Sequence, residues 1–141
     1  AEQVASINGF KSKGAVCCNI NGGYMVVALL AKADEEVIVI SNSAHTKTPE
    51  EGICSLEKGT KLIFKEALTE SDINEKTKFV FATNTLIKKN AKGEYQEVAT
   101  DLESFHKITK AKGVTLVLDC NSPYHYYCAI SEKSTPFDIL I

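Results

Sequence analysis

Three polar side chains that could do chemistry, His45, Asn84 and Asp119, each stand just after a predicted strand of this 141-residue chain. An imidazole can stack on a ring or move a proton, while an amide and a carboxylate can hold a ligand through hydrogen bonds or charge. The carboxyl ends of parallel strands meet at the edge where open α/β sheets bind ligands. We therefore expect these three side chains to belong to one ligand site.

Asp119 is the most informative of the three. It follows Val114–Leu118, an apolar run without polar alternation, which is typical of a central parallel strand buried on both faces. We expect the carboxylate to accept a ligand cation or N–H group. The alternatives are that Asp119 caps the loop after it, that His45 is merely solvated, and that Asn84 is a turn residue.

Gly22 and Gly23 precede the apolar segment Tyr24–Ala33. If that segment is a helix, the glycines could expose N–H groups to a phosphate, although they match neither the Walker nor the dinucleotide-binding sequence. The same glycines, following Asn21, also fit a β-hairpin turn. Periodicity alone cannot separate the two, and we favour the helix.

The elements that must position these groups alternate between strands and helices. The other predicted strands are Ala15–Ile20, Val37–Ser41, Thr60–Lys65, Lys78–Thr83 and Phe137–Ile141. A short helix is capped by Thr69 and Asp72, and a longer one begins with a capping box at Thr100 and ends at Gly113. A polar excursion, Lys88–Tyr95, contains a turn.

This order predicts one α/β domain over residues 1–141, a three-layer sandwich with an open, mainly parallel sheet. If Tyr24–Ala31 is a strand, the domain is instead α+β with an N-terminal hairpin. Either way, we expect no metal site, since no C-x-x-C sequence is present.

The composition of the chain limits the classes of partner that it could bind. The formal net charge is −2, which argues against a nucleic-acid binding face. All sixteen basic residues are lysine, so an anion must be held by backbone N–H groups, lysine or histidine. No segment is long and apolar enough for a membrane, and the five cysteines are read as thiols in a reducing cytoplasm.

Cys120, beside Asp119, raises the hypothesis of a thiol nucleophile. A nucleophilic thiol needs a base within reach. His45, His106 and His125 are candidates, and no spacing favours one of them. A buried, inert thiol is the favoured interpretation, and no catalytic residue is assigned.

The order of these parts, from about Gly22 onward, resembles the large domain of fold-type I pyridoxal-phosphate enzymes, particularly the class V aminotransferase and cysteine desulfurase branch. Gly22 and Gly23 are similar to the phosphate-cup turn, and His45 to the histidine that stacks on the cofactor ring. Asn84 is near that family's polar strand end. Asp119 resembles the aspartate that pairs with the pyridine nitrogen.

The resemblance implies an enzyme acting on amino acids or their sulfur, as a transferase or lyase, with pyridoxal phosphate as cofactor. The family's Schiff-base lysine would fall beyond Ile141, and its substrate-anchoring arginine is absent. In that case the chain is a fragment of a longer protein and is not expected to be active alone.

Two other hypotheses remain. A non-catalytic α/β binding domain that self-associates would explain the apolar end Phe137–Ile141, since such a strand can pair between chains. A caspase-like pseudoenzyme or thiol enzyme is third, because the run into Cys120 resembles the strand before that family's nucleophile. The nucleophile would then align with Asn121. We expect a homo-oligomer and a small-molecule ligand.

Overall fold

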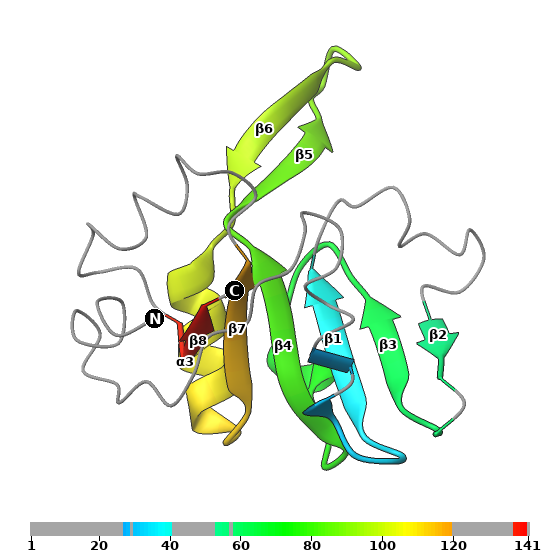
Figure 1. Cartoon of the computed structure of the whole chain (residues 1–141). Coiled ribbons are helices and arrows are strands. Elements are labelled where there is room, and N and C mark those ends of the chain that lie inside the picture. The colour runs from blue at the N-terminus through cyan, green and yellow to red at the C-terminus, as the bar shows by residue number, and fades with distance from the viewer. Residues whose placement is uncertain (1–26, 29, 41–52, 57, 120–136, 141) are drawn as a thin grey trace.

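The computed structural model describes residues 27–28, 30–40, 53–56, 58–119 and 137–140 (Figure 1). In chain order the elements are β1 (Glu36–Ile40), β2 (Ile53–Ser55), β3 (Lys61–Phe64), the 3-10 helix η2 (Glu70–Asp72), β4 (Thr77–Thr83), β5 (Thr85–Lys89), β6 (Tyr95–Ala99), α3 (Leu102–Ala111), β7 (Thr115–Asp119) and β8 (Ile139–Leu140). Among the described residues, six of the strands form one sheet in the order β2-β3-β1-β4-β7-β8.

The sheet is mainly parallel, as predicted. β1 pairs in parallel with β3 and with β4, β4 pairs in parallel with β7, and β7 with β8. The exception is β2, which pairs antiparallel with β3 at one edge. β2 is not among the predicted strands, because a three-residue edge strand has too short a pattern to recognise.

Both faces of the sheet are covered, which makes the predicted three layers. Side chains alternate along β1, so Ile38 and Ile40 join the core beneath α3, while Val37 and Val39 join a second core cluster. That second cluster includes Val27, Ala28 and Ala31, which lie on the other face of the sheet. The α/β prediction is confirmed.

The segment before β1 is helical where it is described. Val27, Ala28 and Leu30 have helical conformation, and the Ala31 N–H donates to the Val27 carbonyl oxygen at 3.1 Å, the spacing of an α-helical turn. The helix prediction is therefore confirmed at these residues, and the alternative strand is wrong there. Gly22 and Gly23 lie outside the described residues.

The start of α3 differs by one residue from the prediction. Asp101, not Thr100, is the N-cap, and its side chain accepts a hydrogen bond from the Ser104 N–H at 3.2 Å. The Thr100 hydroxyl instead donates to the Thr83 carbonyl oxygen at 2.6 Å. Both residue types cap helices well, so a contact distant in sequence decides which one does so here.

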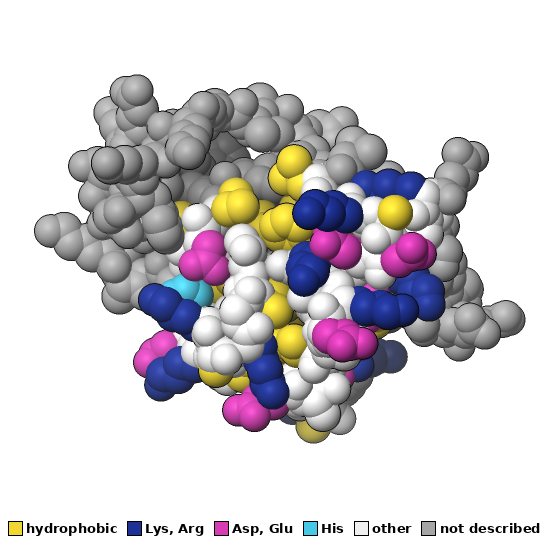
Figure 2. Space-filling model, turned by 90° about the horizontal axis from the view of Figure 1, so that it is seen from below, with side chains coloured by type: hydrophobic (Ala, Val, Ile, Leu, Met, Phe, Trp, Pro, Cys, Tyr) yellow, Lys and Arg dark blue, Asp and Glu magenta, His cyan; other side chains and the backbone are white. Residues whose placement is uncertain are grey.

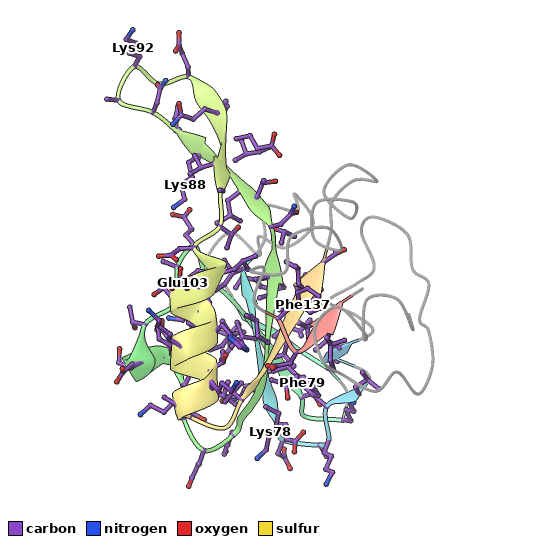
Figure 3. The ribbon with its side chains drawn as sticks, turned by 90° about the vertical axis from the view of Figure 1, so that its left-hand side faces the viewer. Lys78, Phe79, Lys88, Lys92, Glu103 and Phe137 are labelled. Atoms are coloured by element: carbon purple, nitrogen blue, oxygen red, sulfur yellow. The ribbon has the colours of Figure 1, made fainter. Side chains whose placement is uncertain are left out.

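The segment predicted as a polar excursion is a β-hairpin. β5 and β6 pair antiparallel from Thr85↔Ala99 to Lys89↔Tyr95, and Gly93, with φ of +82°, lies in the predicted turn. In Figure 3 Lys92 marks the tip of the hairpin, at the opposite end of the molecule from Lys78 in β4. The strands of the hairpin were not predicted, because their side chains are mostly exposed and lack a core-facing pattern.

No helix in the described part of the chain is long and apolar enough to cross a membrane.

Candidate functional site

Two of the predicted site residues end neighbouring strands. In the parallel ladder of β4 and β7, Thr83 is paired with Asp119, and Asn84 is the next residue after Thr83. Both polar residues therefore lie at the carboxyl edge of the sheet. Along the chain, the strand after β1 and β2 is β3, which lies on one side of β1, whereas β4 lies on the other side. The direction in which strands are added to the sheet therefore reverses between β1 and β4. Such reversals mark the edge where open α/β sheets bind ligands.

The remaining predicted site residues cannot be placed. Gly22, Gly23 and His45 lie outside the described residues, as do Cys120 and Asn121. His45 comes five positions after Ile40, the last residue of β1, and β1 is the strand beside β4.

Asp119 is a half-buried carboxylate. Burial raises the pKa of Asp119 from 3.8 to about 6, because desolvation disfavours the charged form. Among the described residues, no hydrogen bond or ion pair involves its carboxylate. At pH 7 the group is mostly ionised, so it is suited to accept an N–H group or a cation.

Asn84 carries a second unsatisfied acceptor. Its side-chain oxygen Oδ1 is buried and has no hydrogen-bond partner among the described residues. An unpaired buried acceptor costs about 1–3 kcal/mol, so a ligand donor or a water molecule there would be stabilising. Asn84 and Asp119 each carry an acceptor without a partner among the described residues, and both lie at the carboxyl edge of the sheet.

Three hydrogen bonds hold the chain where β4 ends. The Thr100 hydroxyl donates to the Thr83 carbonyl oxygen at 2.6 Å, and the Thr100 N–H donates to the Asn84 carbonyl oxygen at 3.0 Å. The Thr83 hydroxyl donates to the Thr85 carbonyl oxygen at 2.8 Å. These contacts of Thr100 could not be predicted from local sequence patterns, because they depend on the unpredicted hairpin that brings Thr100 back to β4.

His106 is engaged elsewhere. Its Nε2 atom lies 3.3 Å from Oδ1 of Asp138, the residue just before β8. The other carboxylate oxygen of Asp138 accepts the Leu116 N–H at 2.8 Å, and Leu116 precedes Asp119 by three residues in β7. The Asp138 carboxylate therefore links the residue before β8 to His106 in α3 and to Leu116 in β7. In the described part of the chain, no group of three or more histidine, cysteine, aspartate or glutamate side chains could hold a metal ion.

Among the described residues, the opposite end of the sheet carries no buried side-chain atom that lacks a hydrogen-bond partner. Figure 2, seen from below, shows lysine and acidic side chains intermixed over the amino ends of β4 and β7. Interspersed charges of both signs are typical of a solvated surface.

Comparison with known proteins identifies a fold and no closer relationship. No family model and no curated protein matches the chain. A solved structure that does match is an O-acetylhomoserine sulfhydrylase from Wolinella succinogenes, described as catalysing sulfur transfer in methionine biosynthesis. The identity is 22% and the TM-score 0.50, over 82% of this chain and 33% of the sulfhydrylase chain. The chain thus has the fold of about a third of that enzyme.

Proposed function

We propose that this chain is a cofactor-binding segment of a fold-type I pyridoxal-phosphate large domain, from an enzyme that acts on amino acids or their sulfur. The single observation that carries the proposal is Asp119, a half-buried carboxylate without a partner among the described residues, at the carboxyl end of β7. The fold likeness to a sulfhydrylase supports the same class of chemistry.

The residues fit one end of the cofactor. A mostly ionised carboxylate is the acceptor that the N–H of a protonated pyridine ring needs, and Asp119 would supply it. The buried acceptor of Asn84 lies at the same edge and would receive a second donor of the ligand. Gly22 and Gly23 would hold the phosphate and His45 would stack on the ring, as the sequence resemblance implies.

The cofactor, when bound, supplies an electron sink that stabilises negative charge on the carbon atoms of an amino acid. Asp119 would hold the pyridine nitrogen protonated, which strengthens that sink. Assignment to the class V branch rests on the sequence resemblance alone, because the sulfhydrylase is neither a class V aminotransferase nor a cysteine desulfurase.

Titration with the cofactor tests the proposal. Pyridoxal 5′-phosphate and pyridoxamine 5′-phosphate are added to the chain and binding is followed by absorbance and fluorescence. We expect Asp119→Asn to weaken binding about tenfold or more, because a hydrogen bond to a charged group contributes about 1.5–3 kcal/mol. The pyridoxamine form needs no lysine, so it reports on the ring and phosphate contacts alone.

Glu103→Gln is the matched control. It also removes one carboxylate, but the Glu103 side chain is 79% exposed on α3 (Figure 3) and is paired with Lys107 at 3.4 Å. The control should bind both forms like the unmodified chain. Equal affinities of Asp119→Asn and Glu103→Gln would contradict the proposed role of Asp119.

A self-associating binding domain is the second candidate, and the hairpin favours it. Ile87 is 55% exposed and Tyr95 is 75% exposed on the face of the hairpin that also carries Lys89 and Glu97. A two-stranded hairpin is marginally stable in water unless something covers it. A face that carries both signs of charge suits a second copy of the chain better than a strongly charged partner.

Sedimentation or size-exclusion chromatography distinguishes this candidate. If the hairpin holds two copies together, Ile87→Lys should convert a dimer to a monomer, because it buries a charge at the contact. Lys92→Glu, at the tip of the hairpin, should leave the dimer intact. A chain that is already monomeric without substitution would exclude the hairpin as a dimer contact.

A further inference from the structure

We propose that Thr100 is the positioning residue of the site, holding the carboxyl end of β4, where Asn84 follows Thr83, the residue paired with Asp119. This proposal rests on the proposed function for the ligand, but its structural part can be tested without one. Thr100 stands between the hairpin and α3, and its exposure is 9%. It donates only to the backbone carbonyl oxygens of Thr83 and Asn84 at the end of β4 and not to the side chains of Asn84 or Asp119.

Thr100 binds two consecutive residues of the β4 end. Its hydroxyl donates to the Thr83 carbonyl oxygen at 2.6 Å, in a buried bond between residues 17 positions apart. Its N–H donates to the Asn84 carbonyl oxygen at 3.0 Å. Two hydrogen bonds from one residue to adjacent carbonyls fix the orientation of the peptide between them, because rotation would break at least one bond.

The peptide between Thr83 and Asn84 is close in the sequence and in the sheet to both candidate residues, Asn84 and Asp119. It carries Asn84 directly, and Thr83 is the residue paired with Asp119 in the ladder of β4 and β7. Thr100 is itself held, since its carbonyl oxygen accepts the Leu102 N–H at 2.8 Å at the start of α3. Thr100 therefore connects the start of α3 to the carboxyl end of β4 through its side chain and its backbone.

The same contacts explain how the hairpin leaves the sheet without loosening the site. The Thr83 hydroxyl donates to the Thr85 carbonyl oxygen at 2.8 Å, and Thr85 is paired with Ala99, the residue before Thr100. The two strands of the hairpin, β5 and β6, are thus connected by hydrogen bonds where they leave the sheet. These contacts should limit how far a movement of the exposed hairpin is transmitted to Asn84.

Nuclear magnetic resonance of the unmodified chain and three variants tests the proposal. Thr100→Val removes the hydroxyl at nearly constant volume, and Thr100→Ser keeps it. Thr109→Val is the matched control, because Thr109 is also a buried threonine, 0% exposed, whose hydroxyl donates to a carbonyl oxygen (His106, 3.2 Å), but it lies at the other end of α3. The readouts are the side-chain amide signals of Asn84 and the titration midpoint of Asp119.

We expect Thr100→Val to shift the Asn84 amide signals and to move the Asp119 midpoint from about 6 toward its ordinary value, by about half a unit or more, as water reaches the carboxylate. Thr100→Ser and Thr109→Val should leave both readouts near those of the unmodified chain. Pyridoxamine 5′-phosphate affinity should fall about fivefold in Thr100→Val alone.

Unchanged Asn84 signals and an unchanged Asp119 midpoint in Thr100→Val would overturn the proposal. So would equal changes in Thr109→Val, since they would indicate a general loosening of the fold. If Thr100→Val does not fold, Thr100→Ala makes the same comparison with a smaller side chain. If Asp119→Asn leaves cofactor binding unaffected while Thr100→Val moves both signals, the proposed function fails and the role of Thr100 stands.

Discussion

Replacing Asp119 with asparagine is expected to stabilise the folded chain by about 2 kcal/mol at pH 7 and to leave its stability near pH 4 almost unchanged. Burial raises the pKa of Asp119 from 3.8 to about 6 in the folded chain. The folded chain therefore binds the proton more tightly than the unfolded chain. The contribution of Asp119 to stability is therefore most favourable below pH 4 and is lost as the pH rises from 4 to 6.

The size of this effect follows from the pKa shift. A shift from 3.8 to about 6 corresponds to about 3 kcal/mol for a fully buried group. Asp119 is only half-buried, so we reduce the expected value to about 2 kcal/mol. Asparagine has a similar shape and carries no charge at any of these pH values, so its variant should not show the loss.

Urea denaturation at pH 4, 5, 6 and 7 measures the difference. The unfolding free energies of the two chains should diverge between pH 4 and 6 and then run parallel. Glu103→Gln serves again as the control, and its curve should follow that of the unmodified chain. Coincident curves for Asp119→Asn and the unmodified chain at pH 7 would show that the carboxylate is not desolvated.

A gain in stability together with a loss of ligand binding would have a clear meaning. A group that destabilises the fold is retained when it has another use. Asp119 would then be a residue whose charge costs folding free energy until a ligand neutralises it. The two experiments on this residue therefore support each other without depending on the same measurement.

Replacing Asp138 with alanine is expected to destabilise the chain by about 3 kcal/mol. The Asp138 carboxylate accepts the N–H of Leu116, which is 0% exposed, at 2.8 Å, and contacts His106 at 3.3 Å. Alanine leaves the Leu116 N–H without this acceptor inside β7 and removes the contact between β8 and α3. The backbone bond from the Asp138 N–H to the Leu116 carbonyl oxygen remains.

Asp138→Asn separates the two contributions. Its carbonyl oxygen can still accept the Leu116 N–H, so it should lose only about 1 kcal/mol, mainly from the weaker contact with His106. Chemical denaturation of both variants at pH 7 gives the comparison. An alanine variant no less stable than the asparagine variant would show that the Leu116 N–H finds another acceptor.

The strands and helix that form the centre of the fold could be predicted from the sequence. β1, β4 and β7 are runs of β-branched and apolar residues, and α3 is bounded by a capping residue and by Gly113, with φ of +69°. These signals are local. The positions of Asn84 and Asp119 at strand ends could be predicted for the same reason, because a polar residue after a buried strand is visible without the structure.

The features that were missed depend on contacts distant in sequence. β2 is a strand because β3 lies beside it, and its three residues carry no pattern of their own. The choice of Asp101 over Thr100 as N-cap follows from the bond between Thr100 and Thr83. The positioning role of Thr100 could not be predicted, since it requires the hairpin to return the chain to β4.

The hairpin leaves and re-enters the molecule at adjacent points, which makes it replaceable. Leu86 is 5% exposed and anchors its base in the core, whereas its neighbour Ile87 is paired with Glu97 outside the core. Any peptide with closely spaced ends can be joined at Ile87 and Glu97. A hairpin shortened or lengthened beyond Ile87 and Glu97 should therefore leave the core contact of Leu86 in place.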